Sequence, residues 1–174
     1  MNKDFLAKIN NIINEKFSSI YSLKKEIGYT GGGLDEMLKG NRNFSEEVLK
    51  KLLPILEISR EEFDSWIVVD NYPEKLIEKA IEAHKNRKYK RKSILAQNIN
   101  AGIKEKGLSQ TAFGKIIGHS QSVISCVING KESLSDNLAE KIAAGFGISA
   151  EEVKAWDLAD KYSFKTLELA LELK

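Results

Sequence analysis

Cysteine, histidine and proline are scarce in this chain of 174 residues, which contains one cysteine, two histidines and two prolines. The single cysteine, Cys126, cannot form an internal disulfide, and together with the histidines it matches no zinc-binding spacing. The few prolines and the many leucine, lysine and glutamate residues favour helices over loops. We therefore expect an all-α fold with no metal and no cofactor.

Long apolar runs are also missing. No stretch approaches the roughly 20 apolar residues that span a bilayer, and the first residues, MNKDFLAKIN, lack the apolar core of a secretion signal. We expect a cytoplasmic protein with no membrane partner. The chain has no Ser-His-Asp, Cys-His or paired-carboxylate constellation, and its three consecutive glycines lack the lysine of a phosphate-binding loop. We therefore expect neither an enzyme nor a small-molecule substrate.

Positive charge is concentrated in one short run. The net charge of the whole chain is +2, whereas residues 85–92, KNRKYKRK, carry six positive charges and no negative one, so the rest of the chain is net −4. A run of this kind is either a solvated linker or a segment that contacts nucleic acid.

The chain repeats itself at a constant offset of 90 residues without a gap. A fixed offset over this length predicts two copies of one structural unit, covering roughly residues 3–84 and 93–174 and joined by the basic run. The matched pairs are Ile9/Ile99, Asn10/Asn100, Gly28/Gly118, Gly40/Gly130, Ile58/Ile148, Trp66/Trp156, Asp70/Asp160 and Tyr72/Tyr162.

Helical periodicity predicts five helices in the second copy, followed by a C-terminal helix. Serines at 109, 120, 135 and 149 are good N-caps, and the glycines that follow the second and third helices suit their ends. The C-terminal helix is rich in leucine, which predicts packing either on its own unit or on another subunit. The expected buried positions are Leu95, Ile99, Ile103, Ala112, Phe113, Ile116, Ile124, Val127, Ile128, Leu138, Ile142 and Phe146.

Residues 108–130, LSQTAFGKIIGHSQSVISCVING, closely resemble the phage-repressor (Cro/XRE-type) helix-turn-helix family. The shared features are Ser109-Gln110 at the start of the second helix, Gly114 and the turn glycine Gly118, the capping Ser120, Ile124-Ser125 within the third helix, and the closing Gly130. The resemblance extends over nearly all of residues 94–153. It implies a lambda-repressor-like fold, and for the whole chain two tandem domains of five helices, each with an extra C-terminal helix.

The resemblance also implies which residues contact DNA. The third helix would lie in the major groove with Ser120, Gln121, Ser122 and Ser125 near the bases. Gln110 would contact a phosphate, and Asn129 and Lys131 the flanking backbone. The alternative is that these polar side chains simply form the solvent face of a packed helix.

The first copy departs from this pattern. Ile20 replaces the glutamine of the second helix, and the third helix begins with Thr30 and three glycines, followed by Leu34, Asp35 and Glu36. Glycines weaken a helix, and adjacent carboxylates repel phosphates. We expect this copy, residues 1–84, to serve in dimerisation, in auxiliary DNA contact or in binding a protein.

The basic run, residues 85–92, directly precedes the first helix of the second copy, residues 93–174. It could follow the DNA backbone or enter the minor groove, which would make affinity depend strongly on salt. The residues concerned are Arg87, Lys88, Lys90, Arg91 and Lys92.

Together these features predict a sequence-specific regulator of transcription, a repressor that binds double-stranded operator DNA as a homodimer. A monomer that uses both copies as a pseudo-dimer is the second possible geometry. The alternative function is a protein-interaction factor, antitoxin-like or an inhibitor, that retains the helix-turn-helix fold.

Overall fold

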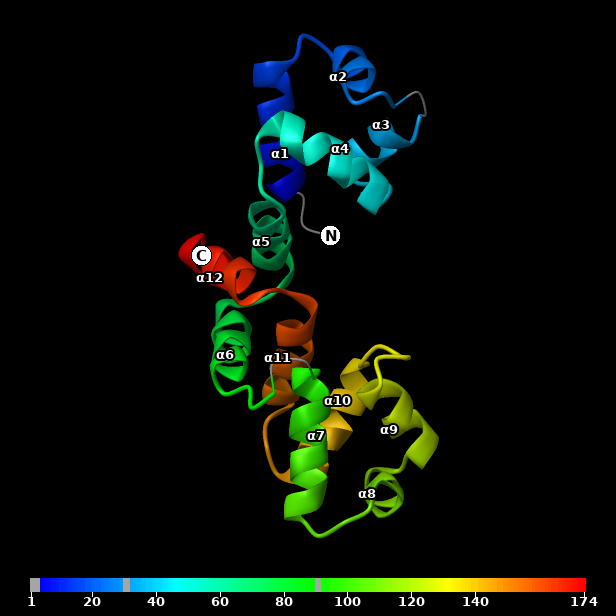
Figure 1. The fold of residues 1–174 in the computed structure, drawn as a ribbon. Coiled ribbons are helices and arrows are strands. Elements are labelled where there is room, and N and C mark those ends of the chain that lie inside the picture. The colour runs from blue at the N-terminus through cyan, green and yellow to red at the C-terminus, as the bar shows by residue number, and fades with distance from the viewer. Residues whose placement is uncertain (1–3, 30–31, 90–91) are drawn as a thin grey trace. The chain divides into compact units, whose positions relative to one another are not determined.

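The chain is described by a computed structural model, which covers residues 4–29, 32–89 and 92–174 (Figure 1). In these ranges the backbone forms twelve α-helices and no strand, which confirms the prediction of an all-α fold. The chain divides into two compact units. Unit 1 ends at Tyr72, and unit 2 runs from Pro73 to Glu172.

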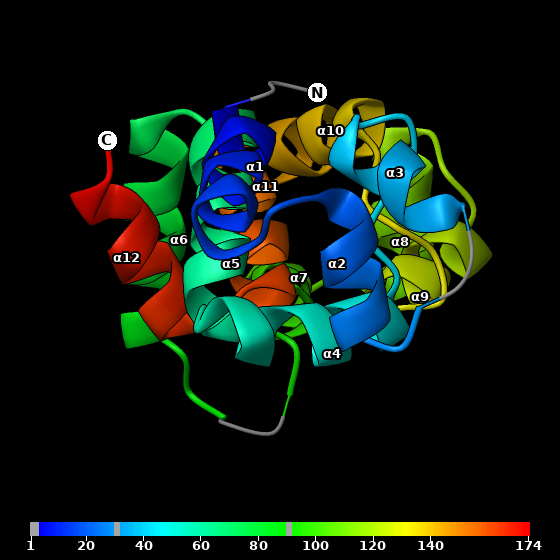
Figure 2. The ribbon, with the colours of Figure 1, turned by 90° about the horizontal axis from the view of Figure 1, so that it is seen from above.

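Unit 1 is a five-helix bundle in which α1 packs against α3, α4 and α5; Figure 2 shows α1 beside α5. Its core contains apolar side chains from all five helices, with Phe63 at the centre of two edge-to-face contacts with Phe5 and Phe44. The helices are α1 (Asp4–Lys16), α2 (Ile20–Glu26), α3 (Gly33–Leu38), α4 (Glu46–Leu56) and α5 (Arg60–Asn71).

Unit 2 contains seven helices. In the core formed by residues 94–161, the ring of Phe113 stacks on the ring of Phe146, with centroids 4.5 Å apart. The helices are α6 (Glu74–Lys85), α7 (Ile94–Glu105), α8 (Gln110–Ile117), α9 (Gln121–Ile128), α10 (Asp136–Phe146), α11 (Ala150–Lys161) and α12 (Phe164–Glu172). Helices α4 and α10 begin and end at positions 90 residues apart, and so do α5 and α11.

Serine N-caps start the helices where the sequence predicts them. In unit 2 the side chains of Ser109, Ser120, Ser135 and Ser149 each accept a hydrogen bond from the backbone N–H three residues later. Such a cap satisfies one of the free N–H groups at a helix start and contributes about 1 kcal/mol. Helix boundaries in the functional region are therefore set locally.

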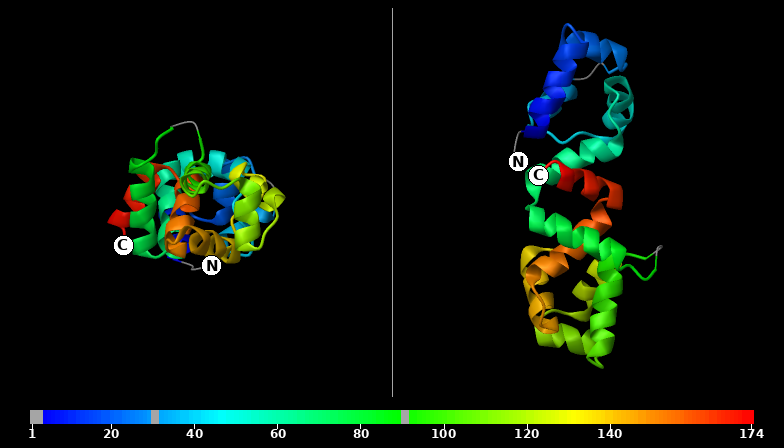
Figure 3. Two further views of the ribbon diagram at one scale, coloured as in Figure 1. Left: turned by 90° about the horizontal axis from the view of Figure 1, so that it is seen from below. Right: turned by 90° about the vertical axis from the view of Figure 1, so that its left-hand side faces the viewer.

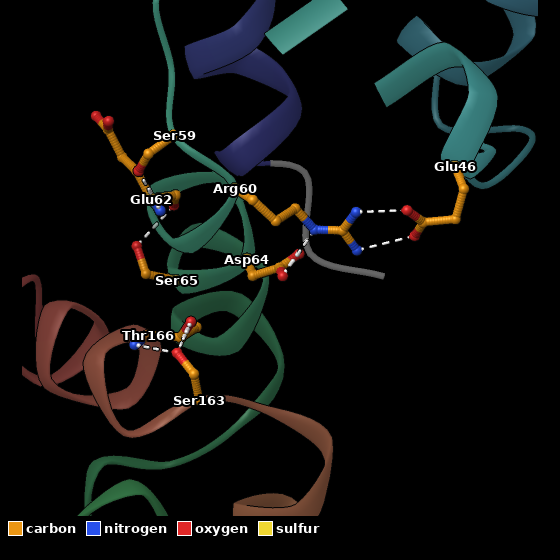
Figure 4. A network of polar contacts seen from close by, with 8 residues as sticks. All are labelled: Glu46, Ser59, Arg60, Glu62, Asp64, Ser65, Ser163 and Thr166. Carbon is orange, nitrogen blue, oxygen red and sulfur yellow. Dashed lines mark hydrogen bonds and ion pairs between the residues drawn. The ribbon is translucent and has the colours of Figure 1, made fainter. Parts of the chain in front are cut away.

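The start of α5 is capped by a serine and joined to α4 by an ion pair (Figure 4). Ser59 accepts a hydrogen bond from the Glu62 N–H, while the Arg60 guanidinium forms paired bonds of 2.8 and 3.0 Å with the Glu46 carboxylate of α4 and a third with Asp64. The hydrogen bonds with Glu46 raise the pKa of Arg60 and lower that of Glu46. The loop between α4 and α5 is thus bridged by a bidentate ion pair.

Helix α6 packs on both α11 and α12 in unit 2 (Figure 3). The buried face of α6 is apolar and includes Ile77 and Ala80, and α12 buries Leu167 and Ala170. The sequence repeat assigns α6 to the N-terminal copy, but its apolar face is covered within unit 2 because α11 and α12 supply a matching surface. Most of the leucine-rich face of α12 is therefore used inside the chain.

Asp160, on α11, holds the start of α7. Its carboxylate accepts hydrogen bonds from the backbone N–H groups of Ile94 and Leu95, at 2.7 and 3.0 Å, and from the Ser93 hydroxyl at 2.5 Å. In unit 1 the Asp70 carboxylate likewise accepts a bond from the Phe5 N–H at 3.0 Å. Each aspartate neutralises the positive end of the first helix of its bundle.

Replacing Asp160 with alanine is therefore expected to lower the free energy of unfolding by about 1–2 kcal/mol, because two helix N–H groups lose their acceptor. Chemical denaturation of the purified variants measures the effect. Asp157→Ala is the matched control, since Asp157 on the same helix forms an i,i+4 ion pair with Lys161 and such pairs contribute about 0.3–0.5 kcal/mol. Equal losses in the two variants would contradict the role of Asp160.

Candidate nucleic-acid interface

Helices α8 and α9 are joined by a tight turn that fixes the start of α9. Gly118 lies in the turn with a φ of 70°, a left-handed conformation that favours glycine. A Cβ atom on Gly114 would lie 2.6 Å from the His119 carbonyl oxygen. The turn therefore passes so close to α8 that a side chain at position 114 would displace it.

The inner faces of these two helices hold them on the core. Phe113, Ile117, Ile124 and Val127 are buried, three of them as the sequence analysis predicts for these helices. The prediction for Ile116 is wrong, because this side chain is 61% exposed. The buried stripe of α8 is centred on positions 113, 114 and 117, which leaves Ile116 on the solvent side.

The outer face of α9 presents polar side chains. Gln121 and Ser122 in its first turn are exposed, and Ser125 one turn later is half-buried. Asn129 donates hydrogen bonds to the Ser125 carbonyl at 2.8 Å and to its hydroxyl at 3.1 Å. The polar face is therefore ordered along the length of α9 and open to solvent at its N-terminal end.

Side-chain amides connect α9 to α8 and α7. Gln121 Nε2 donates to Gln110 Oε1 at 3.4 Å, and Gln110 Nε2 donates to Asn100 Oδ1 at 3.2 Å. Asn100 in turn donates to the Ala96 carbonyl on its own helix at 2.8 Å. Asn100 was not identified as a site residue from the sequence, although it is one of the positions matched by the repeat.

Two further predicted site residues have local structural roles. The Ser120 hydroxyl caps α9 by accepting a hydrogen bond from the Val123 N–H. The backbone N–H of Lys131 donates to the Cys126 carbonyl at 2.8 Å, and the lysine side chain is exposed. Cys126 is a half-buried free thiol. A DNA contact by Ser120 or Lys131 remains a prediction.

The charge of this surface favours an anionic partner. No Asp or Glu occurs from Ser109 to Lys131, and Lys141 lies 3.3 Å from the imidazole of His119 in the turn. On α10, Asp136 is paired with Lys154, and the hydrogen bond from that lysine lowers the pKa of the Asp136 carboxyl. A polyanion could therefore approach α8 and α9 without meeting a carboxylate of these helices.

Residues of the predicted basic arm are partly folded onto α7. Gln97 bonds to the backbone of Tyr89 and Lys92, and the Arg87 guanidinium is directed to the carbonyls of the same two residues. Lys88 is exposed. The predicted contacts of Lys90 and Arg91 lie outside the described residues.

The corresponding surface of unit 1 has a different chemistry. Ile20 and Tyr21 on α2 are exposed, the tyrosine by 77%. On α3, Asp35 forms an ion pair with Lys24, and the hydrogen bond from that lysine lowers the pKa of the Asp35 carboxyl. Asn41 donates to the Glu36 carboxylate at 3.0 Å. Unit 1 thus presents apolar and acidic groups where unit 2 presents amides and hydroxyls.

The described ranges hold neither a metal-binding cluster nor a membrane-spanning helix. These residues contain no group of three or more His, Cys, Asp or Glu side chains arranged to hold a metal ion. None of the helices they form has both the length and the apolar character needed to cross a bilayer.

A family model described as a helix-turn-helix matches residues 99–153. The match begins within α7 and includes α8, the turn, α9 and α10, and therefore every residue of the polar face described above. It indicates a DNA-binding regulator. Comparisons with curated proteins and with solved structures find no match.

Proposed function

We propose that this protein is a sequence-specific regulator of transcription that binds double-stranded DNA through unit 2. The observation that carries the proposal is the N-terminal turn of α9, where Gln121 and Ser122 are exposed, α8 and α9 carry no carboxylate, and Gln121 is oriented by Gln110. A glutamine presented in this way can bond to the edge of an adenine in the major groove. Gln110, Asn129 and Lys131 flank the helix and would contact phosphates.

Selection from a pool of random duplexes tests this proposal. Purified full-length protein at a stated salt concentration is expected to enrich one short motif, because base contacts discriminate by about 1–3 kcal/mol per position. Gly114→Val, which displaces the turn before α9, serves as the negative control. Recovery of unenriched sequences by the native protein would exclude sequence-specific recognition.

We further propose that the protein acts as a repressor and as a homodimer. A symmetric operator has two half-sites about one helical turn, or roughly 34 Å, apart, and requires two reading heads. Because each chain has one such DNA-binding surface, in unit 2, only a dimer can occupy both half-sites. Sedimentation of the complex with the selected duplex is expected to give two chains per operator; one chain per palindromic operator would favour the pseudo-dimer, with residues 1–84 as the second head.

A second candidate function is binding of a protein, as in an antitoxin-like factor or an inhibitor. The exposed Ile20 and Tyr21 of unit 1, beside the carboxylates of α3, favour this reading, since aromatic and apolar groups are enriched at protein interfaces. Ile20→Ser together with Tyr21→Ser is expected to leave duplex selection unchanged and to abolish a protein complex if one forms. Loss of duplex selection in this variant would instead place unit 1 in DNA binding or dimerisation.

A further inference from the structure

The described part of the basic loop, residues 86–89 and 92, is held against α7 by one side chain. Gln97 Oε1 accepts a hydrogen bond from the Tyr89 N–H at 2.9 Å, and its Nε2 donates to the carbonyls of Tyr89 and Lys92 at 3.0 and 2.9 Å. Arg87 donates to the same two carbonyls at 3.1 and 2.6 Å. Five hydrogen bonds therefore converge on two loop residues, and three of them come from Gln97.

A concavity of about 370 Å³ lies between this loop and α7. Among the described residues that line it, four side chains are cationic and none is an Asp or Glu. Gln97, Asn98 and Asn100 of α7 contribute amide groups to the same wall. The cations are Arg87, Lys88, Lys92 and Lys104.

The composition of this concavity selects its ligand. Cations and amide N–H groups without a neighbouring carboxylate favour an anion, and phosphate is bound by lysine charge and arginine hydrogen bonds in many proteins. Lys92 lies over the Tyr89 ring, 5.3 Å from its centroid. This contact holds the Lys92 ammonium group beside the loop residue that Gln97 binds.

The position of the concavity points to the source of the phosphate. Asn100 lines it and also accepts the hydrogen bond from Gln110, which orients Gln121 on α9. These amide contacts connect the wall of the concavity to the first turn of α9. Because a duplex carries a phosphate charge every 1.7 Å or so along its axis, a DNA that contacts α9 can also place its backbone at this site.

We propose that the concavity is a binding site for a backbone phosphate of the DNA that flanks the bases contacted by α9, and that Gln97 is the positioning residue that forms it. The proposal rests on the proposed function. It assigns to Gln97 a role in affinity without a role in base recognition.

The test compares Gln97→Ala with Asn137→Ala, a control that replaces an exposed amide on α10 that is not among the described residues lining the concavity. On random duplexes, Gln97→Ala is expected to weaken binding about 5-fold and to flatten the plot of log affinity against log salt by about one, the value for one lost phosphate contact. Asn137→Ala is expected to match the native protein. The ratio of affinities for selected and random duplexes should stay unchanged in both.

A second variant separates the site from the folding of the loop. Lys104→Gln removes an exposed charge of α7 and is expected to flatten the salt dependence by a similar amount without lowering the midpoint of thermal unfolding. The assignment is overturned if the native protein and both variants give the same salt slope, or if inorganic phosphate binds with equal strength to the native protein and to Gln97→Ala. Failure of the native protein to bind any duplex would instead overturn the proposed function.

Discussion

Replacing Gln121 with alanine is expected to weaken binding to the selected duplex by about 1–3 kcal/mol, or roughly 5- to 150-fold, and to change binding to random duplexes little. The reason is that Gln121 is exposed in the first turn of α9 and is held by the Gln110 side chain. An oriented amide can form two hydrogen bonds to one base edge. Fluorescence anisotropy at a fixed salt concentration, with both duplexes, measures the two affinities.

Gln110→Ala provides a graded comparison for this result. It leaves Gln121 in place but removes its orienting partner, so we expect an intermediate loss on the selected duplex together with a small loss on random duplexes from the missing phosphate contact. An equal loss on selected and random duplexes for Gln121→Ala would contradict base recognition by this residue.

Replacing Gly114 with valine is expected to lower the free energy of unfolding by about 2–4 kcal/mol, because the first added carbon would lie 2.6 Å from the His119 carbonyl oxygen. This neighbour is backbone, and it can move only if the turn between α8 and α9 moves. We expect a fall in the midpoint of thermal unfolding of roughly 10 °C or more, with the loss of duplex selection.

Lys115→Val is the matched control for this variant. Lys115 is the next residue of the same helix and is exposed, so the substitution places the same side chain in α8 at a propensity cost of about 0.5 kcal/mol, without the clash. A Gly114→Val protein as stable as Lys115→Val would show that the turn is not tightly packed against α8.

Local signals in the sequence predict much of the fold. Serine caps such as Ser109 and Ser149 mark helix starts, and the spacing of Leu95, Ile99 and Ile103 predicts the buried face of α7; the structure has these features where the sequence places them. Both signals depend on a few neighbouring residues. Both can therefore be recognised in the sequence without knowledge of the tertiary structure.

Other features depend on contacts between distant residues and could not be predicted in this way. Helical spacing alone gave Ile116 an inward position, whereas the close approach of the turn at Gly114 rotates the packed face of α8 away from it. The repeat gave no indication that α6 would pack with α11 and α12. The amide contacts of Asn100 and Gln97 have no periodic signature, since they join side chains to atoms of other segments.

The site residues fall between these cases. The order of polar side chains on α9 was predicted from a resemblance over residues 94–153, and the helix-turn-helix family model matches residues 99–153. The structure adds the connection from Gln121 through Gln110 to Asn100. The contacts of these residues with DNA remain predictions, as does the role of unit 1.

The most direct test of base recognition by α9 is photo-cross-linking from position 122 to the selected duplex. A photoreactive residue that replaces the exposed Ser122 is expected to cross-link to a base inside the enriched motif, whereas the same group at the exposed position of Glu140 on α10 should give no base cross-link. Cross-links from position 140 but not from position 122 would contradict the account.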